Sequence, residues 1–312
     1  MELHRTSGRA GLGFALASTT MLLWAVLPIA LKGVLDVLDA FTITWARFVV
    51  SALVLGAALA ARSDLPHLRG IGGPRAALLA TATLFLAANY VAYLVGLDWS
   101  SAADAQVLIQ LGPILLSVGG IFVFREHFTR LQWTGLGVLV AGLTVFVAAR
   151  LGDALLAEAG LGAGMAMIVF AAVVWAVYGL AQKQLLHTWR SSHVLLCVYA
   201  GCALVFVPFA TPSTLAALDL PHAALLGFCA LNTVVGYGAF AESLAHWEAS
   251  RVGAVLALTP VGTLVLATAL DALAPDWGVG QTLSPGGWLG ALLVVAGSLA
   301  ASLGAERPRP PA

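Results

Sequence analysis

The chain of 312 residues is 60% hydrophobic and only 10% charged, with a mean hydropathy of +0.95, whereas soluble domains carry about 25% charged residues. This composition excludes an ordinary soluble protein and indicates an integral membrane protein. The formal net charge of +0 argues against a nucleic-acid partner, and the 3 cysteines lack ligand spacing, so we expect neither a metal nor a cofactor.

Apolar runs long enough to cross a membrane recur along the whole chain, since a helix needs about 20 such residues. We expect ten spans in an all-α membrane protein. Their centres lie near Leu22, Ser51, Leu86, Pro113, Val140, Ala172, Cys202, Val234, Val261 and Val295. The first run follows Arg5 and Arg9, but it continues to about Leu31, too far for the apolar core of a signal peptide.

The distribution of Lys and Arg predicts the orientation, because positive residues are retained on the cytoplasmic side. With the N-terminus inside, only Lys32 and Arg150 fall on the opposite side, and Arg47 alone lies within a span. An even number of spans then places both termini in the cytoplasm. We expect a multi-pass protein of the cell (inner) membrane.

The sequence repeats itself after about 150 residues, as duplicated transporters do. The stretch "LWAVLPIALK" in the first run aligns with "VWAVYGLAQK" in the sixth, which pairs Trp24 with Trp175. Likewise "WTGLGVLVAG" matches "WLGALLVVAG", and between these segments Pro113 matches Pro260. The alternative is that Trp, Ala and Gly are simply common in membrane helices.

A repeat of five spans must be inverted, because an odd number of crossings makes the second copy enter the membrane from the opposite side. We expect a first five-helix repeat over 1–150, a second over 151–305 and a cytoplasmic tail over 306–312. Inverted repeats place a substrate site near the membrane midplane, between the halves, and exchange inward and outward openings by rocking.

Two amides lie in the fourth span, where polar groups are costly and tend to face the bundle interior. Gln106, Gln110 and Pro113 share one helical face. The matching residues of the second half are Gly253 and Ala257, so the amides belong to one half only. We favour a substrate path lined by the two amides, and hydrogen bonding between helices is the alternative.

Other central spans contribute further substrate-binding candidates. A tyrosine near the midplane needs a hydrogen-bond partner, and a tryptophan there lies too far from either interface to be an anchor. Core packing is the alternative. Besides the glutamines, the candidates are Trp24, Asn89, Tyr90, Tyr93, Trp175, Tyr178, Tyr237 and Thr259.

Pro113 and Pro260 each remove a backbone donor near mid-membrane and free carbonyls of the preceding turn. We expect a hinge at each proline, because alternating access needs points at which helices bend. A static kink that improves packing is the alternative.

Three ionisable residues are candidates for charge or proton coupling. Arg47 could pair with a carboxylate cargo, or it could extend outward to bond carbonyls. Glu242 and His246 lie one turn apart near the inner end of the eighth span and could carry a proton. Ordinary solvation at the cytoplasmic end is the favoured alternative for this pair.

These features together resemble the EamA-like family of the drug/metabolite transporter superfamily. They are the Trp-Ala pairs of the first and sixth spans, Arg47 in "ITWARFVVSALVL", and the Pro113 helix that leads to "FREHFTRLQWTGLGVLVAG". The resemblance covers nearly the whole chain. It implies ten helices around a central cavity and small-metabolite substrates that include amino acids and are often exported.

We therefore expect a secondary active transporter, of exporter type, for small polar or amphipathic metabolites such as amino acids. Its partners would be the substrate, the lipid bilayer and protons as coupling ion. The alternatives are an intramembrane enzyme using Glu242 and His246, or a non-transporting receptor or scaffold. We expect no enzyme, because the usual catalytic motifs are missing from the sequence, and the loops are too short for a receptor to signal through.

Overall fold

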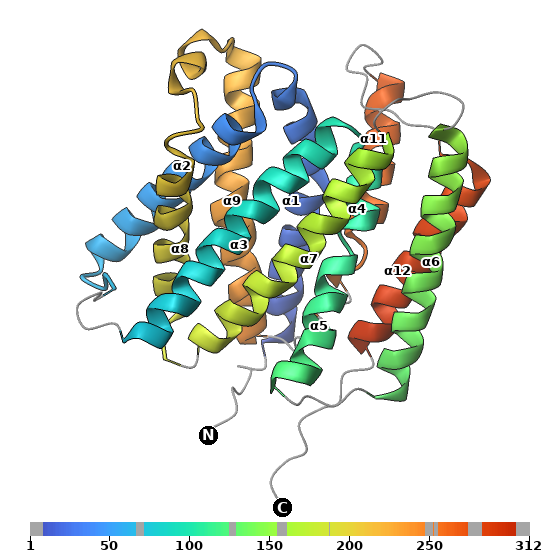
Figure 1. Ribbon diagram of the computed structural model, residues 1–312, viewed down its shortest axis with the longest axis horizontal. Helices are drawn as coiled ribbons and strands as arrows, with labels where there is room; N and C mark the ends of the chain where they lie inside the picture. The colour runs from blue at the N-terminus through green and yellow to red at the C-terminus, as the bar shows by residue number, and fades with distance from the viewer. Residues whose placement is uncertain are drawn as a thin grey trace, which may run out of the picture.

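The computed structural model describes residues 9–66, 72–124, 129–154, 161–186, 188–246, 252, 255–273 and 283–303, within which all regular secondary structure is helical. Figure 1 shows the helices lying side by side in one bundle and alternating in direction. They are α1 (Ala10–Leu35), α2 (Ala40–Ala61), α3 (Gly73–Asp98), α4 (Ala102–Leu108), α5 (Leu111–Phe124), α6 (Arg130–Ala154), α7 (Leu161–Leu185), α8 (Ser191–Phe206), the 3₁₀ helix η1 (Pro212–Ala217), α9 (Leu220–His246), α11 (Thr259–Leu273) and α12 (Pro285–Leu303).

Six of the described helices, namely α1, α2, α3, α6, α7 and α9, are long and apolar enough to cross a membrane. Helices α8, α11 and α12 are apolar but shorter, and the fourth expected span is divided into α4 and α5. Each expected span centre falls within a helix. The prediction of an all-α membrane protein is confirmed, whereas ten crossings stay a prediction.

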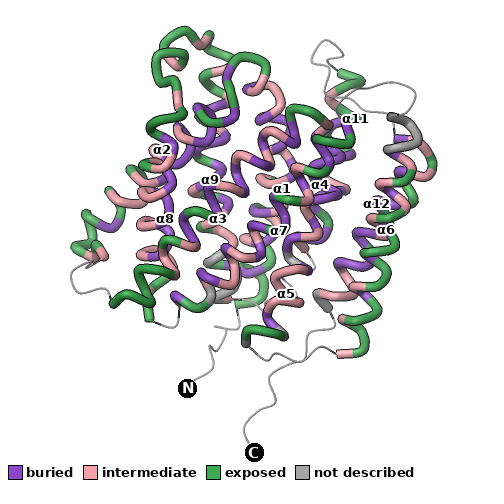
Figure 2. Tube along the Cα trace, viewed as in Figure 1, coloured by how far each residue is buried: buried purple, intermediate pink, exposed green. Residues whose placement is uncertain are grey.

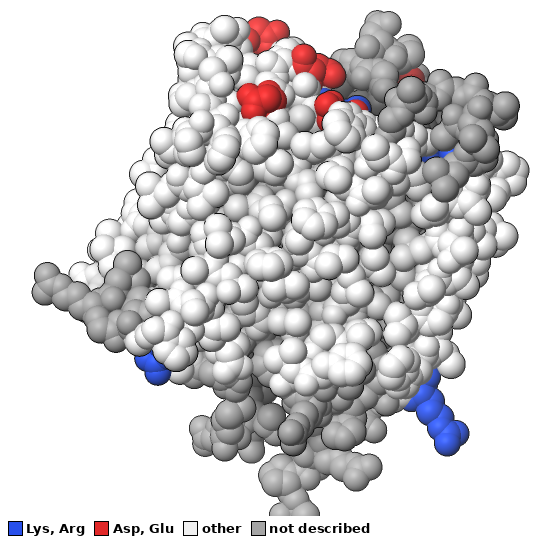
Figure 3. Space-filling model, in the orientation of Figure 1, with Lys and Arg blue, Asp and Glu red and all other residues white. Residues whose placement is uncertain are grey.

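The surface of the bundle has the character expected next to lipid. Large apolar side chains such as Leu53, Phe122 and Leu204 are exposed. Soluble monomers rarely expose wide apolar patches. Figure 3 shows a broad band without charge, with acidic residues and small patches of basic ones at the upper end in this view and further basic residues at the lower edge. Figure 2 shows the buried stretches running along the central helices, including α1 and α4.

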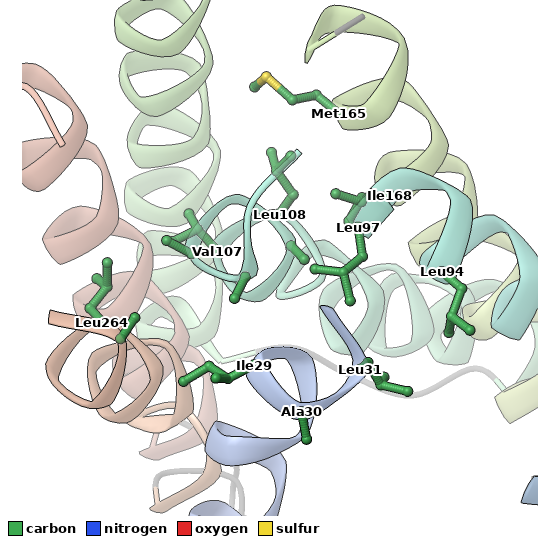
Figure 4. Close-up of a cluster of buried hydrophobic side chains, with 14 of the residues drawn as sticks. Ile29, Ala30, Leu31, Leu94, Leu97, Val107, Leu108, Met165, Ile168 and Leu264 are labelled. Carbon is green, nitrogen blue, oxygen red and sulfur yellow. The ribbon is translucent and has the colours of Figure 1, made fainter. Parts of the chain in front are cut away.

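Most helices pack against a helix that is distant in the sequence. Helix α1 pairs with α9, α3 with α7, and α2 with α8, while α5 lies against α7 and α11 lies against α1. Near the end of the bundle where α1 and α3 terminate, these helices share a buried apolar cluster that includes Ile29, Leu31, Leu97, Leu108 and Ile168. Figure 4 shows labelled side chains from α1, α3, α4, α7 and α11 in this cluster. Apolar packing therefore joins these helices at that end of the bundle.

Helices α6 and α12 form a pair at one edge of the bundle (Figure 1). Their backbones approach each other most closely at glycine residues. Gly135 packs against Gly297 and Ala301, and a Cβ atom added at Gly135 would lie 2.3 Å from the Ala301 backbone nitrogen. Gly142 packs in the same way against the backbone of Gly290. Small residues allow such close approach, and van der Waals packing is a main force between helices in lipid.

A buried ion pair fixes α4 to α6. Arg150 donates from Nε to Asp104 Oδ1 at 2.7 Å and from Nη2 to Asp104 Oδ2 at 2.9 Å, and both side chains are buried. Asp104 also forms a capping box with Ser101 at the start of α4. The bidentate geometry and the additional bonds are what a buried pair needs to offset its desolvation.

Lys32 of α1 also has partners within the protein, at the C-terminal end of α3. Its Nζ donates to the carbonyl oxygens of Leu97 at 3.0 Å, Asp98 at 2.6 Å and Ser100 at 3.1 Å. A cation at a helix C-terminus satisfies orphan carbonyls and complements the helix dipole. Lys32 and Arg150, the basic residues that we expect on the side opposite to the others, therefore each have a structural partner.

We predict that Gly135→Ala destabilises the protein by about 1 to 3 kcal/mol, because the new methyl group would overlap immovable backbone of α12. Gly137→Ala is the matched control, since nothing lies within 4 Å of a Cβ atom added there, and alanine favours helix by about 1 kcal/mol over glycine. The apparent unfolding temperature in detergent measures both. Equal unfolding temperatures for the two variants would contradict the close packing of α6 and α12.

A second prediction concerns the buried ion pair. Asp104→Asn should cost about 3 to 5 kcal/mol, because it removes the carboxylate that faces a buried guanidinium. Asp64→Asn should cost less than about 1 kcal/mol, because its partner Arg190 is 74% exposed and the Asp64 side chain 34% exposed. The same unfolding measurement compares them, and a small loss for Asp104→Asn would show that the buried pair is not required for folding.

Candidate functional site

The centre of the site is a proline in α1. Pro28 lies inside that helix and has no N–H, so the carbonyl of Trp24, four residues earlier, loses its helical partner. Gln106 of α4 supplies a replacement, because its Nε2 donates to the Trp24 carbonyl oxygen at 2.8 Å. The amide of Gln106 is thus committed to a bond between helices.

Two further helices bond the neighbouring carbonyls of α1. Asn232 of α9 donates from Nδ2 to the Leu23 carbonyl at 2.7 Å, and Thr263 of α11 donates from Oγ1 to the Ala25 carbonyl at 2.8 Å. We refer to Gln106, Asn232 and Thr263 as the carbonyl clamp. It joins α4, α9 and α11 to three successive carbonyls of one helix.

Gln110 differs from Gln106. Its side chain is only 8% exposed, yet its amide has no hydrogen-bond partner in the described part of the chain. The amide atoms are not among the fully buried polar atoms that lack a partner, so they keep some contact with solvent. An amide with open donors and acceptors is available to a polar ligand. Of the two glutamines, Gln110 is therefore the better candidate for contact with a cargo.

Both predicted hinge prolines follow an interruption of helix. Residues Ile109 and Gln110 form a turn between α4 and α5, where Gly112 N donates to the Ile109 carbonyl at 2.9 Å in place of a regular helical bond. Helix α5 begins directly after this turn, and Pro113 is its third residue. In the second half, α11 begins with Thr259 and Pro260, preceded by a similar turn. The missing proline donors account for both breaks.

The side chain of Trp24 packs against aromatic rings of α9. Its ring centroid lies 5.3 Å from that of Tyr237 and 5.8 Å from that of Phe240, both on α9. Gly236 makes room for the indole, because a Cβ atom there would lie 2.8 Å from Trp24 Nε1. Trp24 and Tyr237 are therefore brought together, as expected for two members of one site.

Arg47 of α2 lies inside the bundle and is 3% exposed. Its Nε donates to Thr233 Oγ1 at 3.2 Å, and its Cζ lies 4.7 Å from the centroid of the Tyr90 ring. The hydroxyl of Tyr90 interacts in turn with the side chains of Thr233 and Tyr237. Within the described residues, Arg47 makes no bond to a backbone carbonyl, so the alternative of an outward-reaching arginine is not what is observed.

The remaining substrate-binding candidates fall into different surroundings. Asn89 donates to the Ala171 carbonyl at 2.8 Å, and Thr259 donates to the Leu256 carbonyl, so both bond backbone. Tyr178 is buried in an apolar cluster that also holds Tyr90. The other two are half-buried: Trp175 lies against Gly112, and Tyr93 lies within range of the Arg47 charge.

Glu242 and His246 form a hydrogen bond of 3.1 Å between Oε1 and Nε2. The Glu242 side chain is 63% exposed and that of His246 is 14% exposed. The open setting of the carboxylate agrees with the favoured alternative of a solvated helix end.

Several residues of the site were missed at the level of sequence. The clamp residue Thr263, the Arg47 partner Thr233 and the ion-paired Asp104 were not singled out, because each depends on a neighbour distant in the chain. Pro28 could have been used to find the clamp, because a proline at this position leaves the carbonyl of Trp24 without its helical donor. In the parts of the chain that the structure describes, no cluster of His, Cys, Asp and Glu is suited to a metal ion.

Comparison with known proteins identifies relatives along the whole chain. The model of the EamA-like transporter family matches residues 11–148 and 162–303. The uncharacterized inner membrane transporter YhbE of Escherichia coli is 38% identical over 297 residues, which are 95% of this chain and 92% of the relative. An uncharacterized transporter of Haemophilus influenzae is 34% identical over 295 residues, 94% of this chain and 95% of the relative.

Two more distant similarities add to this comparison. A probable amino-acid metabolite efflux pump of Salmonella typhimurium is 26% identical over 209 residues, 63% of this chain and 66% of the relative. A solved structure titled "Crystal structure of protein" superposes with a TM-score of 0.62 at 20% identity, covering 94% of this chain and 96% of the other. The latter similarity concerns the fold alone.

The two glutamines give a direct test of the carbonyl clamp. Gln106→Leu should lower stability by roughly 0.6 to 2 kcal/mol, because the Trp24 carbonyl loses its donor in an apolar interior. Gln110→Leu, the same substitution one turn away, should change stability by less than about 0.5 kcal/mol. Unfolding temperatures in detergent compare the variants, and an equal or larger loss for Gln110→Leu would reject the distinction between them.

Proposed function

This chain belongs to the EamA-like transporter family, and on that premise we propose that it is a secondary active transporter for a small polar or amphipathic metabolite such as an amino acid. It works by alternating access between two inverted five-helix repeats, 1–150 and 151–305, followed by a tail at 306–312. The observation that carries the proposal is the pairing of helices across the two halves of the bundle.

The helix contacts keep their pattern when the two halves are exchanged. If α1 corresponds to α7 and α3 to α9, the α1–α9 pair becomes the α7–α3 pair, and both pairs exist. The α5–α7 contact becomes the α11–α1 contact in the same way, and the α6–α12 and α2–α8 pairs map onto themselves. Such a pattern is what a two-fold relation between inverted repeats would produce.

Individual contacts support the same relation. The sequence repeat aligns Thr20 with Ala171 and Asn89 with Gly236. Thr20 donates to the Gly236 carbonyl at 3.3 Å, and Asn89 donates to the Ala171 carbonyl at 2.8 Å. Matching positions therefore meet in matching helix pairs, although the polar side chain is on α1 in one pair and on α3 in the other.

Alternating access is supported by the helix breaks and by the apolar packing at one end of the bundle. Discontinuous helices near the midplane are a common feature of transporter binding sites, and Pro113 and Pro260 would serve as the points of bending. The apolar cluster around Leu97 and Leu108 would be the shut gate of one state. Gln110 lies in the turn between α4 and α5, close to the proposed bending point at Pro113.

The proposed orientation has both termini in the cytoplasm of a cell whose inner membrane holds the protein. The positive residues support it, because Lys32 and Arg150, the exceptions to the bias, have structural partners. The YhbE relative is an inner membrane transporter by name. The end that carries Asp39 and Asp98 would then face away from the cytoplasm.

Export is the proposed direction, with proton or substrate exchange as the driving reaction. The name of the Salmonella typhimurium relative, a probable amino-acid metabolite efflux pump, supports export and an amino-acid-derived cargo. Glu242 and His246 stay candidates for the proton. Their hydrogen bond links the two groups, while the exposure of Glu242 favours a site in contact with the cytoplasm.

The proposal is tested by uptake and counterflow in proteoliposomes against amino acids and related metabolites, with and without a pH gradient. We expect movement of at least one solute, and a folded wild-type protein that moves none would refute the proposal. In the same assay Gln110→Leu should lower affinity or alter selectivity by about 10-fold, a typical cost of a lost polar contact to a ligand. Gln184→Leu, at an exposed position of α7, is the control and should transport like wild type.

A further inference from the structure

Arg47 carries a positive charge into the interior of the bundle, where it is 3% exposed. Within the described residues no carboxylate pairs with it, although the other buried arginine, Arg150, holds Asp104 in a bidentate pair. The groups around Arg47 are the hydroxyl of Thr233 and the ring of Tyr90, which are neutral. A buried cation without a counter-charge is costly, so this arrangement implies a ligand that supplies the missing charge.

The donors of Arg47 are mostly unused. A guanidinium has five N–H groups in a planar fork, and in the described part of the chain only Nε has a hydrogen-bond acceptor. Neither Nη atom is among the polar atoms sealed from solvent. The Tyr90 ring covers one face of the guanidinium and leaves the edge for a planar acceptor.

Polar side chains flank Arg47 along α2. Thr44 and Ser51 lie one turn on either side of it, on the same helical face, and both are fully buried. Among the described residues their hydroxyl oxygens have no hydrogen-bond partner, whereas such hydroxyls inside helices often bond the carbonyl one turn back. The stretch of α2 that carries Arg47 is therefore polar and incompletely satisfied.

The charge at this place matches a monoanion. A single guanidinium neutralises one carboxylate and binds it through two parallel bonds, while a phosphate dianion would need further cations. Two other basic residues lie on helices that contact α2. Lys32 is occupied by three carbonyl oxygens, and Arg75 is exposed at the start of α3. Beyond Tyr90 lie Tyr237 and, against it, Trp24, which suit an apolar or amino-bearing remainder of the ligand.

We propose that Arg47 binds the carboxylate of the transported solute, held edge-on by the two Nη groups between α2 and α9, so that the cargo is an amphipathic carboxylic acid of the amino-acid type. This inference rests on the proposed function, because it takes the ligand to be the transported solute. Binding of the ligand can be measured without transport. Arg47 would act as a specificity-determining residue, because a neutral ligand would leave its charge unpaired.

The test measures binding in detergent, without transport. L-amino acids and their 2-oxo acids are compared with the amides and methyl esters of the same compounds, as ligands that raise the unfolding temperature of wild-type protein. We expect stabilisation by one or more carboxylates and an affinity at least about 10-fold lower for the amide and ester. Equal stabilisation by carboxylate and amide would overturn the proposal, and so would the absence of any effective carboxylate.

Variants of Arg47 locate the site. Arg47→Lys keeps the charge but loses the planar fork and should weaken the carboxylate about 10-fold or more, while Arg47→Gln should remove the preference for carboxylate over amide. Arg62→Gln, an exposed basic residue at the end of the same helix, should behave as wild type. If Arg47→Gln fails to fold, Arg47→Lys decides, and wild-type affinity in that variant would reject the proposed contact.

Transport of the same compounds in proteoliposomes separates this inference from the proposed function. If carboxylates bind through Arg47 but no solute moves, the transporter proposal fails and the binding site stands. If solutes move while their amides move equally well and Arg47→Lys is unaffected, the transporter proposal stands and the role of Arg47 is wrong.

Discussion

The structure depends on one constraint, which is that a polar group within hydrocarbon must find its partner inside the protein. Pro28 creates such a group when it frees the Trp24 carbonyl, and Gln106 satisfies it. Asn232 and Thr263 extend the arrangement to the adjacent carbonyls. Pro28 therefore accounts for the bond that α4 makes to α1, and α9 and α11 bond the carbonyls on either side of the freed one.

The same constraint explains how the charges are arranged. Lys32 ends α3, and Arg150 meets Asp104, so two of the buried or half-buried cations serve the fold. Arg47 has a hydroxyl and an aromatic ring instead of a carboxylate. In the described part of the chain no carboxylate pairs with Arg47, which distinguishes it from Arg150 and is what the proposed ligand site requires.

Hydropathy and composition were sufficient to predict the helical bundle, because each expected span centre lies in a helix. The shared helical face of Gln106 and Gln110 also follows from spacing alone. Their different surroundings do not, since the Trp24 carbonyl comes from a helix about 80 residues away in the chain. For the same reason the partners Thr233 and Asp104 could not be identified from local pattern, which contains no information on which helices become neighbours.

The crossing of α6 and α12 has a consequence for how far this edge of the bundle can vary in sequence. Gly135 meets Gly297 and Gly142 meets Gly290, so the contact is unchanged when the two helices exchange roles. A larger side chain at any of these positions would separate the two backbones, and a change on one helix could not be offset on the other, where the facing glycine has no side chain to shorten.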